Sequence, residues 1–392
     1  MTAKTPIYLD YQATTPLDPR VFEAMTPYFT ERFGNPHSVT HRFGWEAESA
    51  VDLARERVAS LIKADLKAIT FTSGATESNN LAIKGAMEAL GARKPHLVVP
   101  ATEHKCVLES ARAMAKRGCR LTELPVQADG LIDLNRLEDA LADDTGLVSV
   151  MAVNNEIGVI QPLAEIGALC RARGVLFHCD AAQAFGKMPL DIDAMKIDLF
   201  SISGHKIYGP KGVGALFARR SRPRVQLVEQ MSGGGQENGL RSGTLSPALC
   251  AGLGDAARIA GDEMADEAAR TERLMARLKA RLWAELPELI LNGHATQRWA
   301  GNLNICFPGL DGELLLAELR DLALSSGAAC ASATSGPSYV LEAIGRRRAE
   351  AQSALRIGIG RFTTDEEVDH AADGIVEAVD KLGGLKPARE HA

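Results

Sequence analysis

A lysine and an aspartate each stand at the end of an apolar stretch. Lys206 closes the run Ser203 to Lys206 directly after the apolar residues 197–202, and Asp180 ends an earlier apolar stretch. A lysine amine forms a Schiff base with an aldehyde, and a carboxylate beside a pyridine nitrogen keeps that nitrogen protonated so that the ring can accept electrons. At neighbouring strand ends, the two side chains indicate a site for pyridoxal phosphate.

The residues beside Lys206 favour this interpretation over a solvated surface lysine, which is the more common case at a strand end. Gly204 lets the backbone come close to a ligand, and Ser203 and His205 carry side-chain donors that suit a phosphate. Four adjacent residues would then bind one anion and one aldehyde.

A second phosphate-binding element is predicted where residues 72–77 turn from a strand into a helix at 78–90. Backbone N–H groups of Gly74, Ala75 and Thr76 would face the ligand there, together with the positive end of the helix dipole. An ordinary helix cap by Thr76 or Ser73 is the alternative. Neither the spacing of a P-loop nor that of a dinucleotide-binding glycine motif is present.

Further polar residues have both a chemical and a structural interpretation. His104 suits stacking on a pyridine face or proton transfer, although a lone histidine is more often structural. Gln183 and Asn155 are able to donate to a ring hydroxyl oxygen or to satisfy loop backbone. Arg356 lies in an apolar run, where a guanidinium is costly unless it meets a carboxylate, and an amino-acid substrate would supply one.

Cys330 differs from the other cysteines because it lies in residues 325–336, a stretch of small residues without apolar periodicity. We expect a mobile, exposed loop whose thiol travels between a substrate and an acceptor. The alternative is a small buried residue in a tightly packed turn.

These residues need a framework, and short β-branched runs alternate with amphipathic ones between residues 60 and 220. Such alternation predicts a mostly parallel sheet covered by helices on both faces. Ligands bind at the carboxyl ends of strands in such a sheet. The polar clusters fall at those ends. The runs expected as strands are 68–71, 96–99, 147–151, 175–178, 199–202 and 214–217.

Composition sets the outer limits. The chain has 392 residues, 46% of them hydrophobic, which is enough for two domains. Residues 253–286 are charged, rich in alanine and almost free of helix breakers, so a long helix is expected to link a first domain to a smaller C-terminal one. We place the large domain at 16–260 and the small domain at 1–15 and 261–392, with the catalytic-cysteine loop at about 325–337.

The net charge of -6 argues against a nucleic-acid or anionic-membrane partner. No apolar run approaches the roughly 20 residues that span a bilayer, and the N-terminus lacks the apolar core of a signal peptide, so the cytoplasm is expected. The seven cysteines contain no C-x-x-C pair and predict neither a disulfide framework nor a metal site.

Taken together, the motifs resemble those of the cysteine desulfurases, within the class V aminotransferase-like pyridoxal phosphate enzymes. The resemblance covers nearly the whole chain. It implies an α/β, fold-type I structure with a mostly parallel seven-stranded sheet and a smaller α+β C-terminal domain. The matching runs are 8–16, 33–36, 71–78, 154–158, 203–212, 233–237 and 241–244.

By that resemblance, Lys206 carries the cofactor, Asp180 pairs with the ring nitrogen, and His104 stacks on the ring and assists proton transfer. Cys330 attacks the substrate sulfur, which gives a persulfide and L-alanine. The remaining roles are a contact with the ring hydroxyl by Gln183, phosphate binding by Gly74, Ala75, Thr76, Ser203 and His205, a further cofactor contact by Asn155, and substrate binding by Arg356, Asn155 and Asn35.

Thr244 in such enzymes reaches the phosphate of the partner subunit, so the resemblance also implies a homodimer. The sulfur would supply iron–sulfur cluster assembly. The sequence leaves the acceptor open between a cluster scaffold, a tRNA-thiolating protein and a cofactor pathway. Two other hypotheses are a selenocysteine lyase or another β-eliminating lyase, in which Cys330 is less essential, and a non-catalytic sulfur carrier or assembly partner. Joint retention of Lys206, Asp180, His104 and Cys330 counts against the non-catalytic hypothesis.

Overall fold

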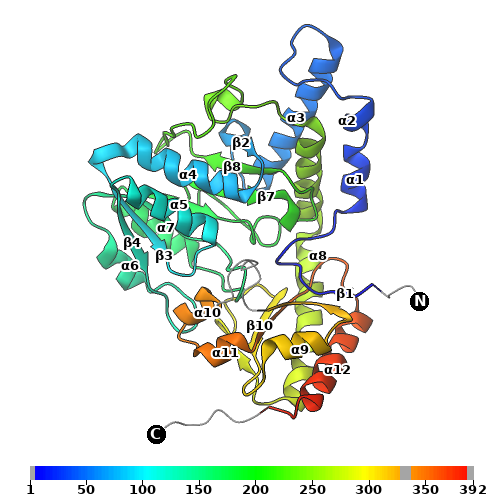
Figure 1. Ribbon diagram of the computed structural model, residues 1–392. Coiled ribbons are helices and arrows are strands. Elements are labelled where there is room, and N and C mark those ends of the chain that lie inside the picture. Colours follow the sequence, from blue (N-terminus) through cyan, green and yellow to red (C-terminus); the bar gives the residue numbers. More distant parts are fainter. Residues whose placement is uncertain (1–4, 327–336, 386–392) are drawn as a thin grey trace.

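A seven-stranded sheet forms the centre of the larger part of the molecule. The computed structural model describes residues 5–326 and 337–385 of the chain (Figure 1). All neighbouring strands are parallel except that β8 runs antiparallel to both β2 and β7. The strand order is β2 (Ile69–Thr72), β8 (Gly214–Ala218), β7 (Leu199–Ser203), β6 (Leu176–Asp180), β5 (Thr145–Ser149), β3 (His96–Pro100) and β4 (Arg120–Leu124).

Six of these strands lie where the sequence predicts them, within two residues at each end. The exception is β4, which the apolar runs do not reveal. It pairs with β3 alone and lies at the edge of the sheet, and its Arg120 and Glu123 are exposed. An edge strand that is open to solvent does not need the continuous apolar run of a central parallel strand.

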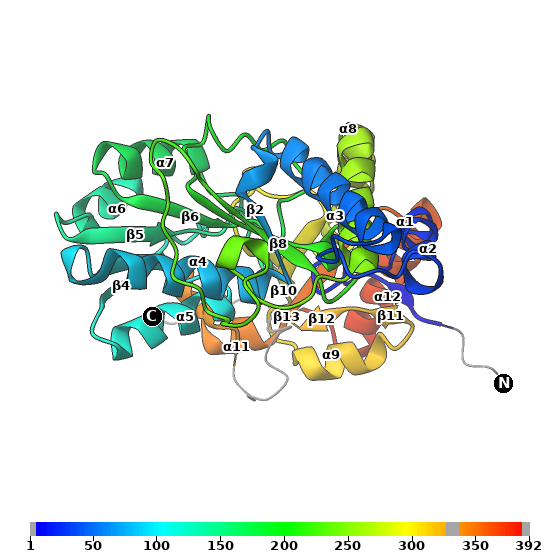
Figure 2. The same ribbon diagram turned by 90° about the horizontal axis from the view of Figure 1, so that it is seen from above.

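Helices cover both faces of the sheet, as the alternation of elements predicts (Figure 2). In β3, Leu97 and Val99 pack under α4 (Ala75–Leu90) and α5 (Lys105–Lys116), whereas Val98 points to the opposite face. This alternation follows from the two-residue period of a strand. The opposite face is covered by α3 (Arg42–Leu61), α6 (Leu134–Ala140), α7 (Leu163–Ala172) and the first half of α8 (Pro247–Glu285).

The long helix α8 extends from the larger part of the molecule into the smaller part (Figure 1). Its residues up to Ala260 pack against the first core, and those from Leu274 to Leu282 pack against a second core. The predicted linking helix is therefore present, and it begins six residues earlier than expected. The predicted domain boundary at 260/261 stays a prediction.

The smaller part is built on a four-stranded antiparallel sheet with the order β12 (Ser325–Ser326), β13 (Ala354–Gly358), β10 (Asn302–Cys306) and β9 (Ile290–Leu291). Near the N-terminus, β1 (Ile7–Tyr8) pairs in parallel with β11 (Leu322–Ala323) and so ties the start of the chain to this part. Its helices are α9 (Gly312–Glu318), α10 (Tyr339–Ala343), α11 (Arg348–Gln352) and α12 (Asp365–Lys381).

Short elements complete the fold. Two helices precede α3 and lie beside α8 in Figure 1, namely α1 (Pro19–Met25) and α2 (Pro27–Thr30). The 3-10 turns are η1 (Leu66–Ala68), η2 (Gly91–Arg93), η3 (Gly204–Lys206) and η4 (Glu237–Gly239). Among the helices in residues 5–326 and 337–385, none combines the length and the apolar character needed to cross a bilayer.

Candidate active site

The carboxyl ends of five strands meet at one edge of the large sheet. Strands β3, β5, β6 and β7 are parallel, and β2 points the same way as β7 because both oppose β8. Each of the polar clusters singled out in the sequence follows one of these ends. The convergence expected from the sequence is therefore confirmed by the topology.

The start of α4 offers its backbone N–H groups to a ligand. Gly74 caps the helix without a side chain, and its φ of 150° is open to glycine and rarely to other residues. The backbone of β8 lies close by, since a Cβ on Gly214 would stand 2.7 Å from the Cα of Gly74. Glu77 turns away from the cleft and accepts from the Ser73 N–H at 2.8 Å. The uncapped N-terminus suits an anion.

Asp180 is buried at the end of β6, and its described hydrogen-bond donors are neutral. Asn79 Nδ2 donates to one carboxylate oxygen at 2.7 Å, and the backbone N–H of Ala182 donates to the other at 2.9 Å. The sequence analysis did not single out Asn79. Its position three residues after Thr76, on one face of the same helix, is the signal that would have found it.

His104 forms the N-terminal cap of α5. Its Nδ1 accepts from the Cys106 N–H at 3.2 Å and lies 2.9 Å from the Cys106 sulfur. Burial lowers the pKa of His104, the charge of Asp180 raises it, and the charge of Lys206 lowers it. Because Nδ1 accepts this hydrogen bond from the Cys106 N–H, the neutral ring carries its proton on Nε2. Burial also raises the pKa of the Cys106 thiol to about 12, so this sulfur is not an activated nucleophile.

Lys206 is the last residue of η3, just beyond β7. Its ammonium donates to the carbonyl oxygens of Gln12 and Ala13, at 2.5 and 2.7 Å. These residues belong to the segment between β1 and α1, which is far away in the sequence. Tertiary folding, not local sequence, brings this segment to the lysine.

The two remaining residues of the Lys206 run lie close by. Ser203 is buried at the end of β7. His205 Nδ1 lies 3.0 Å from the Thr14 hydroxyl, and burial, with the charge of Lys206, lowers the pKa of His205 to about 4. A neutral imidazole held at Nδ1 has its other nitrogen available to donate to an anion.

Gln183 lies in the turn after β6 and is buried. Its Nε2 donates to the Gln12 carbonyl oxygen at 2.8 Å, and its Oε1 accepts from Lys187 Nζ at 3.1 Å. Gln12 O is thus shared by Gln183 and Lys206. Lys187 is a second lysine near the predicted cofactor, and the sequence analysis did not consider it.

Arg356, on β13, comes from the smaller part of the molecule and is 1% exposed. Its guanidinium pairs with Asp10 at 2.7 Å and donates to the Asn155 carbonyl oxygen at 2.9 Å and to Ser325 Oγ at 3.2 Å. Within the described part of the chain its Nε has no acceptor. The sequence predicted a carboxylate partner from a substrate. In the single chain Asp10 supplies a carboxylate, and the substrate role stays a prediction.

Three predicted residues lie apart from this cluster or outside the structure. Asn35 is exposed and accepts from the His37 N–H within its own loop at 2.9 Å. Thr244 is exposed on the loop that precedes α8. Cys330 lies outside the described residues, so its predicted position and role are untested.

Glu103 is a buried acid that follows β3 and directly precedes His104. One oxygen accepts from the Met151 N–H, and the other has no partner among the residues that the structure describes. Burial and the nearby charge of Asp180 raise the pKa of Glu103 well above its usual value. This environment favours the neutral form of the Glu103 carboxyl group.

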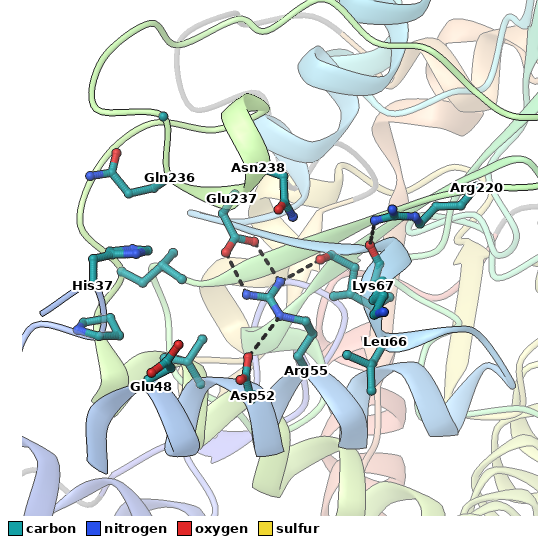
Figure 3. Close-up of a pocket in the computed structure, with 15 residues that line it drawn as sticks. His37, Glu48, Asp52, Arg55, Leu66, Lys67, Arg220, Gln236, Glu237 and Asn238 are labelled. Atoms are coloured by element: carbon teal, nitrogen blue, oxygen red, sulfur yellow. Dashed lines mark hydrogen bonds and ion pairs between the residues drawn. The ribbon is translucent and has the colours of Figure 1, made fainter. Parts of the chain in front are cut away.

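A hollow of about 550 Å³ lies elsewhere, between α3 and the loop that contains η4 (Figure 3). Arg55 crosses it to form a two-pronged pair with Glu237, with N–O distances of 2.7 and 2.9 Å, and Glu237 also accepts from the Phe71 N–H. The same loop is joined to the phosphate-facing helix α4, because Arg241 donates to Glu77 at 2.8 Å. The pairs Arg55–Glu237 and Arg241–Glu77 therefore anchor the loop that carries Thr244 to α3 and to α4.

Pyridoxal phosphate, which the resemblance implies, fits the residues present. The uncapped start of α4 suits its phosphate, and the Asp180 carboxyl group, whose donors in the described part of the chain are both neutral, suits a pyridine nitrogen that carries a proton. Lys206 stands at the end of β7 with the carboxylate on the neighbouring strand β6.

Comparisons with known proteins show the family to which the chain is related. The model of the family described as aminotransferase class-V matches residues 7–370. The "Cysteine desulfurase IscS" of Rickettsia felis is 55% identical over 98% of this chain and 94% of its own length. The "Cysteine desulfurase, mitochondrial" of Drosophila melanogaster is 57% identical over 99% of this chain and 84% of its own length.

Among solved structures, a NifS-like protein superposes with a TM-score of 0.89 at 34% identity and covers 96% of this chain and 100% of its own. The chain therefore belongs to the aminotransferase class-V family and, within it, to the cysteine desulfurases, which are pyridoxal phosphate enzymes.

Proposed function

We propose that the chain desulfurates L-cysteine through Cys330. In this reaction the Cys330 thiolate attacks the substrate sulfur, the substrate C–S bond breaks, and a new S–S bond forms. The substrate Cβ, which carried the sulfur, keeps the electron pair and is protonated. The products are therefore L-alanine and a persulfide on Cys330. This balance needs no further oxidant or reductant until the persulfide is passed on.

The residues at the sheet edge divide the remaining work. Pyridoxal phosphate, when bound, would supply an electron sink for the pair that stays on the substrate when its C–S bond breaks. Asp180 holds a proton on the ring nitrogen, the start of α4 with Ser203 and His205 binds the phosphate, and Gln183 donates to the ring oxygen. Lys206 tethers the cofactor and exchanges a proton with the substrate carbon, assisted by the neutral His104.

One observation carries these assignments. Asp180, Lys206 and His104 follow the carboxyl ends of three parallel strands of one sheet, β6, β7 and β3, and β6 and β7 are direct neighbours. The charges of Asp180 and Lys206 both act on the pKa of His104, in opposite directions. A carboxylate, an amine and an imidazole at one sheet edge suit proton transfer beside a pyridine ring.

For the substrate, we propose that Arg356 binds the carboxylate, with Asn155 and Asn35 as further contacts. A buried guanidinium with an unsatisfied Nε is suited to a second carboxylate. A selenocysteine lyase or another β-eliminating lyase is the second candidate. It uses the same sheet-edge residues and differs only in its dependence on Cys330.

We further propose a homodimer. Five aromatic side chains of α1, α2, the loop after α2 and the start of α3 are between 47% and 61% exposed: Phe22, Phe29, Phe33, Phe43 and Trp45. Large exposed apolar side chains in one stretch of the chain are typical of an interface, and Thr244 is exposed as well. A second copy of the chain is the occupant that would cover both. Sedimentation equilibrium at micromolar concentration tests this, and a monomer there would contradict it.

The sulfur acceptor is proposed to be a protein of iron–sulfur cluster assembly, with a tRNA-thiolating protein as the other option. The cytoplasm stays the predicted location.

The experiment that tests the function measures sulfide and L-alanine released from L-cysteine with a reductant. Wild type is compared with Cys330→Ala and with Cys119→Ala, a matched control that removes a partly exposed thiol in the connection between α5 and β4. A parallel reaction without reductant is analysed by peptide mass spectrometry for a persulfide.

We expect wild type and Cys119→Ala to release equal sulfide and alanine, and Cys330→Ala to release neither while it keeps the visible absorption of bound cofactor. The added sulfur should lie on the Cys330 peptide. Equal sulfide release from Cys330→Ala and wild type would instead show a different lyase.

A further inference from the structure

Lys187 is buried beside the proposed cofactor site, although nothing assigns it a role. It follows Gln183 by four residues in the turn after β6 and is 9% exposed. Burial, with the charge of Lys206, lowers its pKa to about 7, and the more distant charge of Glu267 raises it. The two lysines therefore lie close enough to repel each other.

A buried ammonium normally needs a carboxylate. Among the residues that the structure describes, Lys187 forms no ion pair, and its hydrogen bond goes to the Oε1 of Gln183 at 3.1 Å. Its other close contact is the ring of Trp299, whose centroid lies 6.0 Å from Nζ. Lys187 is thus a buried amine whose hydrogen-bond partner in the described part of the chain is one side-chain amide.

This contact fixes which way the amide of Gln183 faces. The Lys187 amine donates to Oε1, and the Gln12 carbonyl only accepts, so it faces Nε2. A flipped amide would oppose acceptor to acceptor at Gln12 and would lose the hydrogen bond from Lys187 to Oε1, with donor facing donor whenever Lys187 is protonated. The NH2 group is thereby held on the side of Lys206, which bonds the same Gln12 oxygen.

We propose that Lys187 is a positioning residue for pyridoxal phosphate, which locks the Gln183 amide so that it presents an N–H donor, never an oxygen, to the cofactor. The inference rests on the proposed function, because it needs Gln183 to contact the ring oxygen. Lys187 acts through Gln183 and does not touch the reacting atoms.

The alternative is that Lys187 is a packing residue that only contacts Trp299. The two roles differ in what depends on Gln183. A positioning lysine has no effect on the cofactor once the amide is gone, whereas a packing residue has the same effect with or without it. A double-mutant cycle separates them.

The experiment uses the full-length holoenzyme and its variants Lys187→Met, Gln183→Ala and the double variant. Methionine keeps the length and removes the charge. Lys116→Met, at an exposed lysine near the end of α5, is the matched control. Cofactor retention is measured from the visible absorption at a series of dilutions, and thermal unfolding shows that each variant is folded.

We expect Lys187→Met and Gln183→Ala each to raise the apparent Kd for pyridoxal phosphate by about tenfold, as loss of one hydrogen bond to a polar partner would. The double variant should be no weaker than Gln183→Ala alone, and Lys116→Met should match wild type.

Other outcomes separate the two levels of the proposal. A tenfold loss in Gln183→Ala with no change in Lys187→Met overturns the positioning role and leaves the proposed function intact. Multiplying losses in the double variant, about a hundredfold together, also overturn it. No change in Gln183→Ala overturns the ring-oxygen contact itself, and the inference falls with it.

Discussion

Two sets of charged and polar side chains, one around the seven-stranded sheet and one between α8 and α12, lie in different surroundings. Around the large sheet, polar groups are buried: Asp180, Glu103, His178 and the Arg55–Glu237 pair all have low exposure. In the smaller part, α8 and α12 are joined by a ladder of exposed pairs, Arg273–Asp365, Arg277–Asp369 and Arg281–Asp373, spaced four residues apart on both helices.

The difference concerns what water does to a charge. Buried groups such as Glu103 and His178 have pKa values shifted by desolvation, and they keep fixed partners, so they are able to hold or move a proton at a defined atom. Exposed pairs are screened and exchange partners with water. Three predictions test this contrast, from the largest expected effect to the smallest.

The buried pair Arg55–Glu237 should matter most. Replacing Arg55 by Met leaves the Glu237 carboxylate 3% exposed without its cation, and we expect a loss of about 3–5 kcal/mol in the free energy of unfolding. Urea denaturation measures it. The control Arg42→Met breaks an exposed pair with Glu46 and should cost less than about 0.5 kcal/mol. A similar loss of unfolding free energy in Arg55→Met and Arg42→Met would contradict the contrast between buried and exposed pairs. The double variant Arg55→Met/Glu237→Gln, which removes both charges, should recover part of the loss.

His178 should make the large sheet sensitive to acid. It is buried between Ser149 and Ser201, which lie 2.7 and 2.9 Å from its ring nitrogens, and burial lowers its pKa to about 3. Between about pH 6.5 and pH 3 the unfolded chain binds a proton at His178 that the folded chain does not, so stability falls as the pH falls, by up to about 1.4 kcal/mol per pH unit.

The measurement is the slope of unfolding free energy against pH in wild type and in His178→Gln. In the variant, the slope of unfolding free energy against pH should be smaller by up to about 1.4 kcal/mol per pH unit, even if the variant is less stable overall. His37→Gln, at an exposed histidine, is the control. An unchanged slope in His178→Gln would show that the acid sensitivity lies elsewhere.

The exposed ladder should matter least. Arg277→Ala removes the central rung, and we expect the Tm to fall by no more than about 2 °C, with the difference disappearing at high salt. Differential scanning calorimetry at low and high salt checks this. A larger or salt-independent shift would mean that these pairs act as the buried ones do.

Most strands of the seven-stranded sheet were predictable from the sequence, because buried strands need continuous apolar runs. Parallel strands covered on both faces require continuous apolar runs, and six such runs matched β2, β3, β5, β6, β7 and β8. Lys206, Asp180 and His104 each follow one of those runs, so their shared edge followed from topology alone. The edge strand β4 escaped notice because its exposed face is polar.

The partners of those residues were not predictable in the same way. Asn79 bonds Asp180 across 101 residues, Gln12 O accepts from Lys206 across 194, and Asp10 pairs with Arg356 across 346. Lys187 is close to Gln183 in sequence, but its burial is visible only once the core is assembled.

By itself, then, the sequence determined the strands, the edge where they end and the chemical types gathered there, because hydrophobic periodicity and strand direction are local properties of the chain. The tertiary structure alone decided which groups are charged, which nitrogen is available and which amide orientation is locked. Those properties depend on desolvation and on contacts between distant segments, and no local pattern encodes them.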